Sequence, residues 1–220
     1  MGPLIYIAIG LGVAVAVGVV ISRKKQAEAE RARRRDATVT GANVTNDITR
    51  VGKGGVLRLP PFGQSRTPIE THVTRRHRYR QDAGDPWYEL VCEHGRRELL
   101  VEWSRSGGEV YVTGGFEDEN PSLGDLMLTE DDLIAFDEGR RTGFEWDGVQ
   151  WTLAEPPGER FYHADDRGAA EGYYAWEFRA PDESRYLSIE KWEGEADFEV
   201  YHLWAIDARG VEVYDAGAAS

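Results

Sequence analysis

A chain of 220 residues with 41% hydrophobic and 30% charged residues has room for a membrane anchor and one large or two small folded domains. Its net charge of −13 is uneven, because residues 1–42 carry +4 and the remaining residues carry −17. A body this acidic repels nucleic acid and anionic lipid, which excludes both as ligands of the folded part. The single cysteine, Cys92, excludes an intrachain disulfide, and its place in an apolar run predicts a buried side chain.

Residues 1–22 are predicted to form a single transmembrane anchor, because residues 4–21 carry no charge and as a helix would span roughly 27 Å. A cleaved signal peptide is the alternative, but no Lys or Arg precedes the apolar run, and Arg23, Lys24 and Lys25 follow it directly. That basic cluster predicts a single-pass protein of the bacterial inner membrane with its C-terminal domain in the cytoplasm. The large apolar residues of the anchor are Leu4, Ile5, Ile7, Leu11, Val15, Val19 and Ile21.

Small residues recur at fixed spacing in the anchor, at Gly10, Ala14 and Gly18. This spacing lets a second helix approach closely and favours a homo-oligomer, although Gly and Ala are also simply common in such helices. Residues 23–47 then form a charged stalk or linker, either a helical extension of the anchor or a flexible segment.

The soluble part is predicted to be mainly β, with two related antiparallel β-meander or barrel-like units at residues 48–117 and 128–207. A connector (118–127) joins them, and residues 208–220 are expected to be a flexible tail. Each unit has three alternating runs separated by turn residues, which predicts a three-stranded meander with one apolar face. The runs are 87–92, 99–103 and 109–112 in the first unit, and 173–178, 187–191 and 198–201 in the second.

Further elements follow from local signals. Asp147 and Gly148 stand between two alternating runs, which predicts a tight hairpin over residues 144–153. Short strands are expected at residues 55–59 and 69–73, and residues 120–139 carry the signals of a short helix with a cap at Thr129.

The hairpin, the aromatic run 173–178 and the segments 186–190 and 198–201 together resemble the bacterial domain-of-unknown-function family 4178. The second unit carries the resemblance best, and the first unit resembles a diverged copy of it. Members of that family are often found beside phage-shock-type envelope-stress proteins and small membrane proteins. The resemblance therefore implies a role in membrane stress or a membrane complex, with phage-shock-type proteins as partners, and it transfers no catalytic residue.

The residues themselves offer no reactive constellation, so we expect no catalysis, no metal and no cofactor. His72 and His77 lie among arginines, which disfavours a metal ion. Two sets of residues are candidates for an interface. The first is a basic island in an acidic body, and the second is a group of tryptophans that includes one beside a turn. They are Arg75, Arg76, Arg78 and Arg80, and Trp146, Trp151 and Trp192.

Three functions remain open from the sequence. The first is a membrane-tethered adaptor that recruits or regulates a protein partner, with the basic island as either a docking site or a strand edge that resists aggregation. The second is a small-ligand-binding or carbohydrate-binding β domain with Trp146 and Trp151 as a stacking platform. The third, an enzyme or accessory protein for a basic substrate such as a polyamine, depends on the acidic charge of the body. Convergent carboxylates in a pocket would favour this third reading.

Overall fold

The structure is a computed structural model that describes residues 44–81 and 85–215. The expected anchor, its helix-packing residues Gly10, Ala14 and Gly18, and the basic cluster 23–25 lie outside the described residues. Within the part that is described, no helix is both long enough and apolar enough to cross a membrane.

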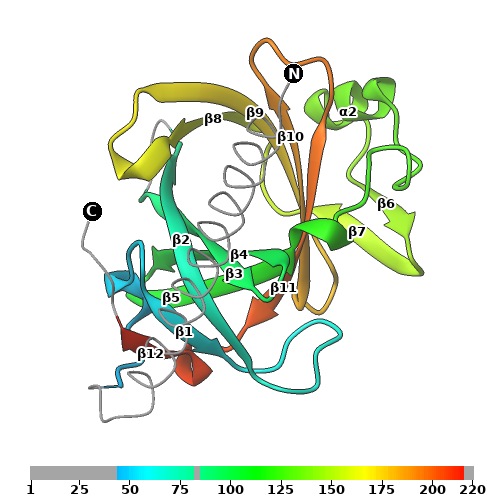
Figure 1. Ribbon diagram of the computed structural model, residues 1–220. Coiled ribbons are helices and arrows are strands. Elements are labelled where there is room, and N and C mark those ends of the chain that lie inside the picture. The colour runs from blue at the N-terminus through cyan, green and yellow to red at the C-terminus, as the bar shows by residue number, and fades with distance from the viewer. Residues whose placement is uncertain (1–43, 82–84, 216–220) are drawn as a thin grey trace, which may run out of the picture. The chain divides into compact units, whose positions relative to one another are not determined.

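Twelve antiparallel strands and one α-helix dominate the described residues (Figure 1). The strands are β1 (Val56–Leu59), β2 (Ile69–Arg80), β3 (Trp87–His94), β4 (Arg97–Ser106), β5 (Glu109–Phe116), β6 (Gly143–Trp146), β7 (Val149–Leu153), β8 (Gly158–His163), β9 (Ala170–Arg179), β10 (Arg185–Trp192), β11 (Glu199–Ile206) and β12 (Glu212–Asp215). The helix is α2 (Glu130–Asp137), and 3₁₀ turns occur at Ile48–Arg50, Glu117–Glu119, Ala164–Asp166 and Ala208–Gly210.

Eight of these strands close into an antiparallel barrel in the order β2-β3-β4-β5-β11-β10-β9-β8. Two pairings between distant parts of the chain close the circle. β5 pairs with β11 from Val112 to Gly114, and β8 returns to pair with the end of β2. The mainly β, antiparallel prediction is confirmed, and the two predicted units share one barrel.

The two meanders lie where the sequence places them, as β3-β4-β5 and β9-β10-β11. Each half of the barrel adds one more strand in front of its meander, β2 in the first half and β8 in the second. First strands pair together and last strands pair together, so the halves are arranged alike around the barrel.

The apolar faces of the meanders point out of the barrel and are covered by other elements. β1, β12 and the turn at Ile48–Arg50 cover the outer face of β3-β4-β5, where Leu90, Cys92 and Val101 are each 0% exposed. This burial confirms the expectation for Cys92. α2 and the β6–β7 hairpin cover the outer face of β9-β10-β11, as the right side of Figure 1 shows.

Local sequence signals explain why α2 and the β6–β7 hairpin form. Thr129 caps α2 with a capping box, because its side chain accepts from the backbone of Asp132 while the Asp132 side chain accepts from the backbone of Thr129. The predicted hairpin forms between β6 and β7, and both Asp147 (φ 51°) and Gly148 (φ 68°) adopt the left-handed region that a primed turn requires.

A bulge in β2 directs the chain from one layer to the other. The pairing of Val73 with Cys92 is followed by that of Arg75 with Val91, so Thr74 is an extra residue. Val73 therefore packs in the outer apolar cluster, while His77 faces the barrel interior beside Glu89.

The expected flexible tail, residues 208–220, needs correction over its described part. Val211 and Val213 are buried in the outer apolar cluster, and β12 pairs with β1. Two alternating valines supply a short strand with one apolar face, which the sequence analysis did not recognise.

Candidate functional site: an acidic barrel interior

Four glutamates project into the barrel from facing walls. Glu89 and Glu102 are direct cross-strand partners on β3 and β4, while Glu177 and Glu190 stand on β9 and β10. β4 and β9 lie four strands apart in either direction around the barrel, yet the negative charge of Glu177 raises the pKa of Glu102. Only side chains that share the interior approach each other in this way, so we call these four residues the carboxylate cluster.

Hydroxyl groups hold the carboxylate cluster in place. The Tyr79 hydroxyl donates to Glu89 Oε1 at 3.3 Å, and Thr113 Oγ1 donates to Glu102 Oε2 at 3.5 Å. Ser188 Oγ lies 3.1 Å from Glu177 Oε1 and 3.2 Å from Glu190 Oε1. A hydroxyl has one proton, so both contacts are hydrogen bonds only when one carboxyl is protonated and donates to Ser188.

Burial raises the pKa of every member of the cluster. It is the largest cause at Glu89 and Glu177, whose pKa values rise to about 7, with Glu98 and Glu155 respectively adding like charge. Burial and the neighbouring carboxylates raise the pKa values of Glu102 and Glu190 well above the usual range. In the folded barrel near pH 7 the cluster therefore retains protons that exposed glutamates would release.

A large cavity of about 1020 Å³ opens at one end of the interior. Glu102 and Glu177 line it from opposite walls, and Trp87, Tyr111 and Tyr186 supply aromatic surface. Glu109, Asp207 and Arg209 lie at its lining as well, and Arg209 is bound to Asp207 at 3.0 Å. The wall of this cavity is thus acidic, with one arginine among its lining residues.

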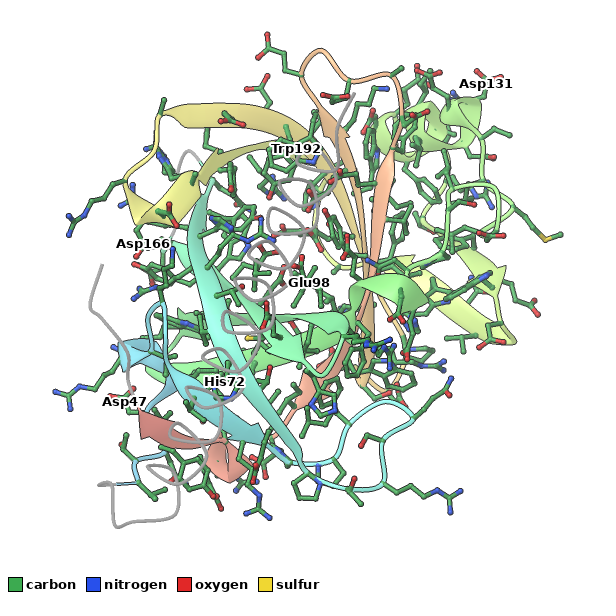
Figure 2. The ribbon with its side chains drawn as sticks, viewed as in Figure 1. Asp47, His72, Glu98, Asp131, Asp166 and Trp192 are labelled. Atoms are coloured by element: carbon green, nitrogen blue, oxygen red, sulfur yellow. The ribbon has the colours of Figure 1, made fainter. Side chains whose placement is uncertain are left out.

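A smaller cavity of about 300 Å³ has different lining residues, with Glu89 as its member of the carboxylate cluster. Figure 2 labels Glu98 and Trp192, which reach this cavity from β4 and β10. Glu190 lines neither cavity, and its buried side chain interacts electrostatically with Glu89, Glu102 and Glu177. The carboxylate cluster therefore links two cavities in one barrel.

The potential metal ligands of the described residues are spread apart. Among residues 44–81 and 85–215 no three His, Cys, Asp or Glu side chains are grouped closely enough to hold a metal ion. The carboxylates are distributed along and across the barrel, which suits a polyatomic ligand better than a single ion.

The basic island does not form one surface. Alternation along β2 sends Arg75 to the interior side, where it pairs with Glu98 at 3.1 Å, and Arg76 to the outer side. Arg76 pairs with Asp166 at 3.3 Å, with both side chains about 15% exposed, and it stacks over the Tyr88 ring at 4.4 Å. Arg78 Nε is buried, and Arg80 lies over the Phe161 ring. These contacts show a structural use for the arginines.

The three tryptophans that the sequence analysis named as interface candidates do not form one surface either. Trp151 is 0% exposed and its indole donates to the Trp146 carbonyl at 3.2 Å, so it offers no ring face to a surface ligand. Trp146 packs beside it against the apolar cluster on the outer face of β9-β10-β11. Trp192, expected at a protein interface, stacks on Tyr173 at 4.7 Å and faces the smaller cavity.

Sequence reasoning missed the carboxylate cluster, because glutamates that alternate with apolar residues are typical of the solvated face of a sheet. A signal was present in the printed sequence. Tyr173 and Trp176 belong to opposite faces of one strand, and large residues on both faces indicate a strand that is covered on both sides.

The fold and its interior define a class of protein: a closed antiparallel β-barrel with a polar, acidic interior and its apolar clusters outside. A family model described as domain of unknown function (DUF4178) matches residues 69–208, which is more than half of the chain. The chain therefore belongs to this family, as the resemblance in the sequence indicated. The match runs through both halves of the barrel as one region, so two separate copies of the family domain are not confirmed. Comparisons with curated proteins and with solved structures found no match.

Proposed function

We propose that the barrel is a binding module that accepts a small organic cation in its larger cavity and carries out no reaction on it. The observation that supports this most strongly is the approach of Glu102 and Glu177 from opposite walls of the cavity. Such an arrangement matches the third reading of the sequence, a basic ligand, combined with the second, a ligand-binding β domain.

The electrostatics favour a cation. Carboxylates away from water are unfavourable when charged unless a cation or several donors compensate them. Arg160 is the buried cation that lowers the pKa of Glu177, but its guanidinium is already bound to Glu155 at 2.6 Å. An ammonium group between Glu102 and Glu177 would be paired on both sides, and Trp87 and Tyr186 would offer ring faces to it.

The double variant Glu102→Gln with Glu177→Gln tests this proposal. We expect the full chain to bind 1-aminobutane and 1,4-diaminobutane, and not the uncharged 1-butanol, in isothermal titration calorimetry. The variant should lose at least about tenfold in affinity, because removing two charged partners costs more than a typical neutral hydrogen bond. Binding should also release protons, seen as a heat that depends on the buffer, because a bound cation lowers the raised pKa values.

Glu145→Gln is the matched control, since it removes the same charge from the exposed surface of β6. Equal binding of the amines and 1-butanol, or an unchanged affinity in the double variant, would rule the proposal out.

We further propose that the barrel functions tethered to the cytoplasmic face of a bacterial membrane, where ligand binding informs a partner protein. The support is the charge-free segment 4–21 followed by Arg23, Lys24 and Lys25, together with the family resemblance. In spheroplasts, external protease should leave a C-terminal tag intact, and Arg23, Lys24 and Lys25 replaced together by Gln should weaken that protection. Crosslinking in native membranes followed by mass spectrometry would identify the partner. A tag that is digested from outside would contradict the orientation.

A further inference from the structure

The smaller cavity is lined by side chains with N–H groups that have no partner among the described residues. His77 is only 5% exposed, and its Nδ1 accepts the backbone N–H of Asp165 at 3.3 Å. Burial, with Arg75 next, lowers the pKa of His77, so the ring is neutral near pH 7 and its proton is on Nε2. No described residue accepts from that Nε2, and the ring lines the cavity.

Trp192 supplies a second donor. Its Nε1 is buried and bonds to no described residue, and the side chain lines the same cavity. Tyr162 lies between the two donors, because its ring contacts His77 at 5.0 Å and Trp192 at 5.4 Å, measured between ring centroids. An unpaired buried N–H such as that of Trp192 is unfavourable, and the His77 Nε2, which bonds no described residue, lies at the same cavity. Together they favour a ligand that brings an acceptor.

The charge of the cavity defines the rest of the ligand. Its acidic lining residues outnumber its one lining arginine, Arg75, and that arginine is bound to Glu98. The acids are Glu89, Glu98, Glu117, Glu171 and Glu199. A carboxylate ligand would meet this charge unfavourably, whereas a neutral carbonyl could accept from His77 and Trp192 while an ammonium group faces Glu89.

From this geometry we infer that the smaller cavity is a second binding site, selective for a small molecule that joins a primary ammonium group to a neutral carbonyl, such as an α-amino amide. The site is separate from the larger cavity, because Glu102 and Glu177 line only that one. At about 300 Å³ it is at the lower limit of small-molecule sites, which restricts the ligand to roughly the size of a single amino-acid amide.

Three probes of matched shape separate the two recognition elements. Leucinamide carries both groups, 3-methylbutylamine lacks the amide, and N-acetyl-leucinamide lacks the charge. At a pH where the amines are protonated, the full chain should bind leucinamide about tenfold more tightly than 3-methylbutylamine, and N-acetyl-leucinamide should not bind. The indole N–H resonance of Trp192 in a ¹⁵N spectrum, assigned by its loss in Trp192→Phe, should shift with leucinamide.

The variants then locate the binding. Trp192→Phe keeps an aromatic ring, although a smaller one, and removes the donor, so it should lower the affinity for leucinamide about tenfold and leave that for 3-methylbutylamine unchanged. Glu89→Gln should weaken both, while Glu145→Gln on the exposed surface of β6 should leave leucinamide binding unchanged. Absence of leucinamide binding, or equal binding of leucinamide and 3-methylbutylamine to the wild-type chain, would overturn the inference. This comparison requires no variant to fold, and it is independent of the outcome for Glu102 and Glu177.

Discussion

Glu89→Gln is expected to stabilise the folded barrel at pH 8 and to leave its stability nearly unchanged at pH 4.5. Glu89 is 8% exposed, and its burial is the largest cause of its shifted pKa. The pKa of the carboxyl rises from 4.5 to about 7 in the folded state. The Tyr79 hydroxyl can donate to the amide oxygen of glutamine as it does to the carboxylate, so the hydrogen bond is retained. The change therefore isolates the charge.

The direction of the pH effect on stability depends on whether the folded or the unfolded state binds the proton more tightly. Below pH 4.5 the carboxyl is protonated in both states, and between pH 4.5 and about 7 only the folded state keeps its proton. Raising the pH through this window therefore favours unfolding, and the loss reaches up to about 3 kcal/mol above pH 7. Glutamine carries no charge at any pH, so the variant should avoid this loss.

Urea unfolding between pH 4.5 and 8.5 measures the difference in free energy of unfolding. Glu145→Gln, which changes the same charge on an exposed strand, should differ from wild type by less than about 0.5 kcal/mol at each pH. A Glu89→Gln variant that is less stable at pH 8, or one whose difference from wild type does not vary with pH, would show that Glu89 is not a buried carboxyl of raised pKa.

The same energetics connect stability to binding. If a cation occupies the interior, the carboxylates become charged partners of the ligand, and the loss above pH 7 is reduced. A ligand of the interior should therefore stabilise the wild-type chain more at pH 8 than at pH 5.

Much of the local structure could be predicted from the sequence because its signals are local. Asp147-Gly148 specifies its turn and Thr129 specifies the start of α2, and alternation identifies the strands of both meanders. Alternation also identifies the apolar face of each strand, although it does not tell whether that face points into a barrel or out of it. The opposite face, which carries Glu102 and Glu177, was therefore given no role in the sequence analysis.

The closure of the barrel depends on contacts between distant residues, which local patterns do not encode. β2 was expected to end near Val73, because the bulge at Thr74 interrupts the alternation and arginines follow. Pairing between β2 and β8 then places the His77 ring against Tyr162, 85 residues away in the sequence. Both cavities exist only once such long-range pairings form, so the site could not be found from motifs.

Gly115→Ala is expected to have the largest effect on the fold, because Gly115 lies where β5 pairs with β11 to close the barrel. Gly115 follows Gly114, the last β5 residue that pairs with β11, and a Cβ at Gly115 would lie 2.3 Å from the His202 carbonyl oxygen. That oxygen belongs to the backbone of β11 and cannot rotate away as a side chain could. The strands must therefore separate, and we expect a loss of about 3 kcal/mol in the free energy of unfolding.

Gly124→Ala is the control, since its Cβ would meet only Ser122 Oγ at 3.7 Å, an ordinary contact. It should change the free energy of unfolding by less than about 0.5 kcal/mol. Thr113 and Leu203, which line the larger cavity, stand on the two strands that Gly115→Ala would force apart. Any Gly115→Ala protein that remains folded should therefore bind organic cations more weakly, whereas wild-type stability together with wild-type binding would contradict a barrel closed between β5 and β11.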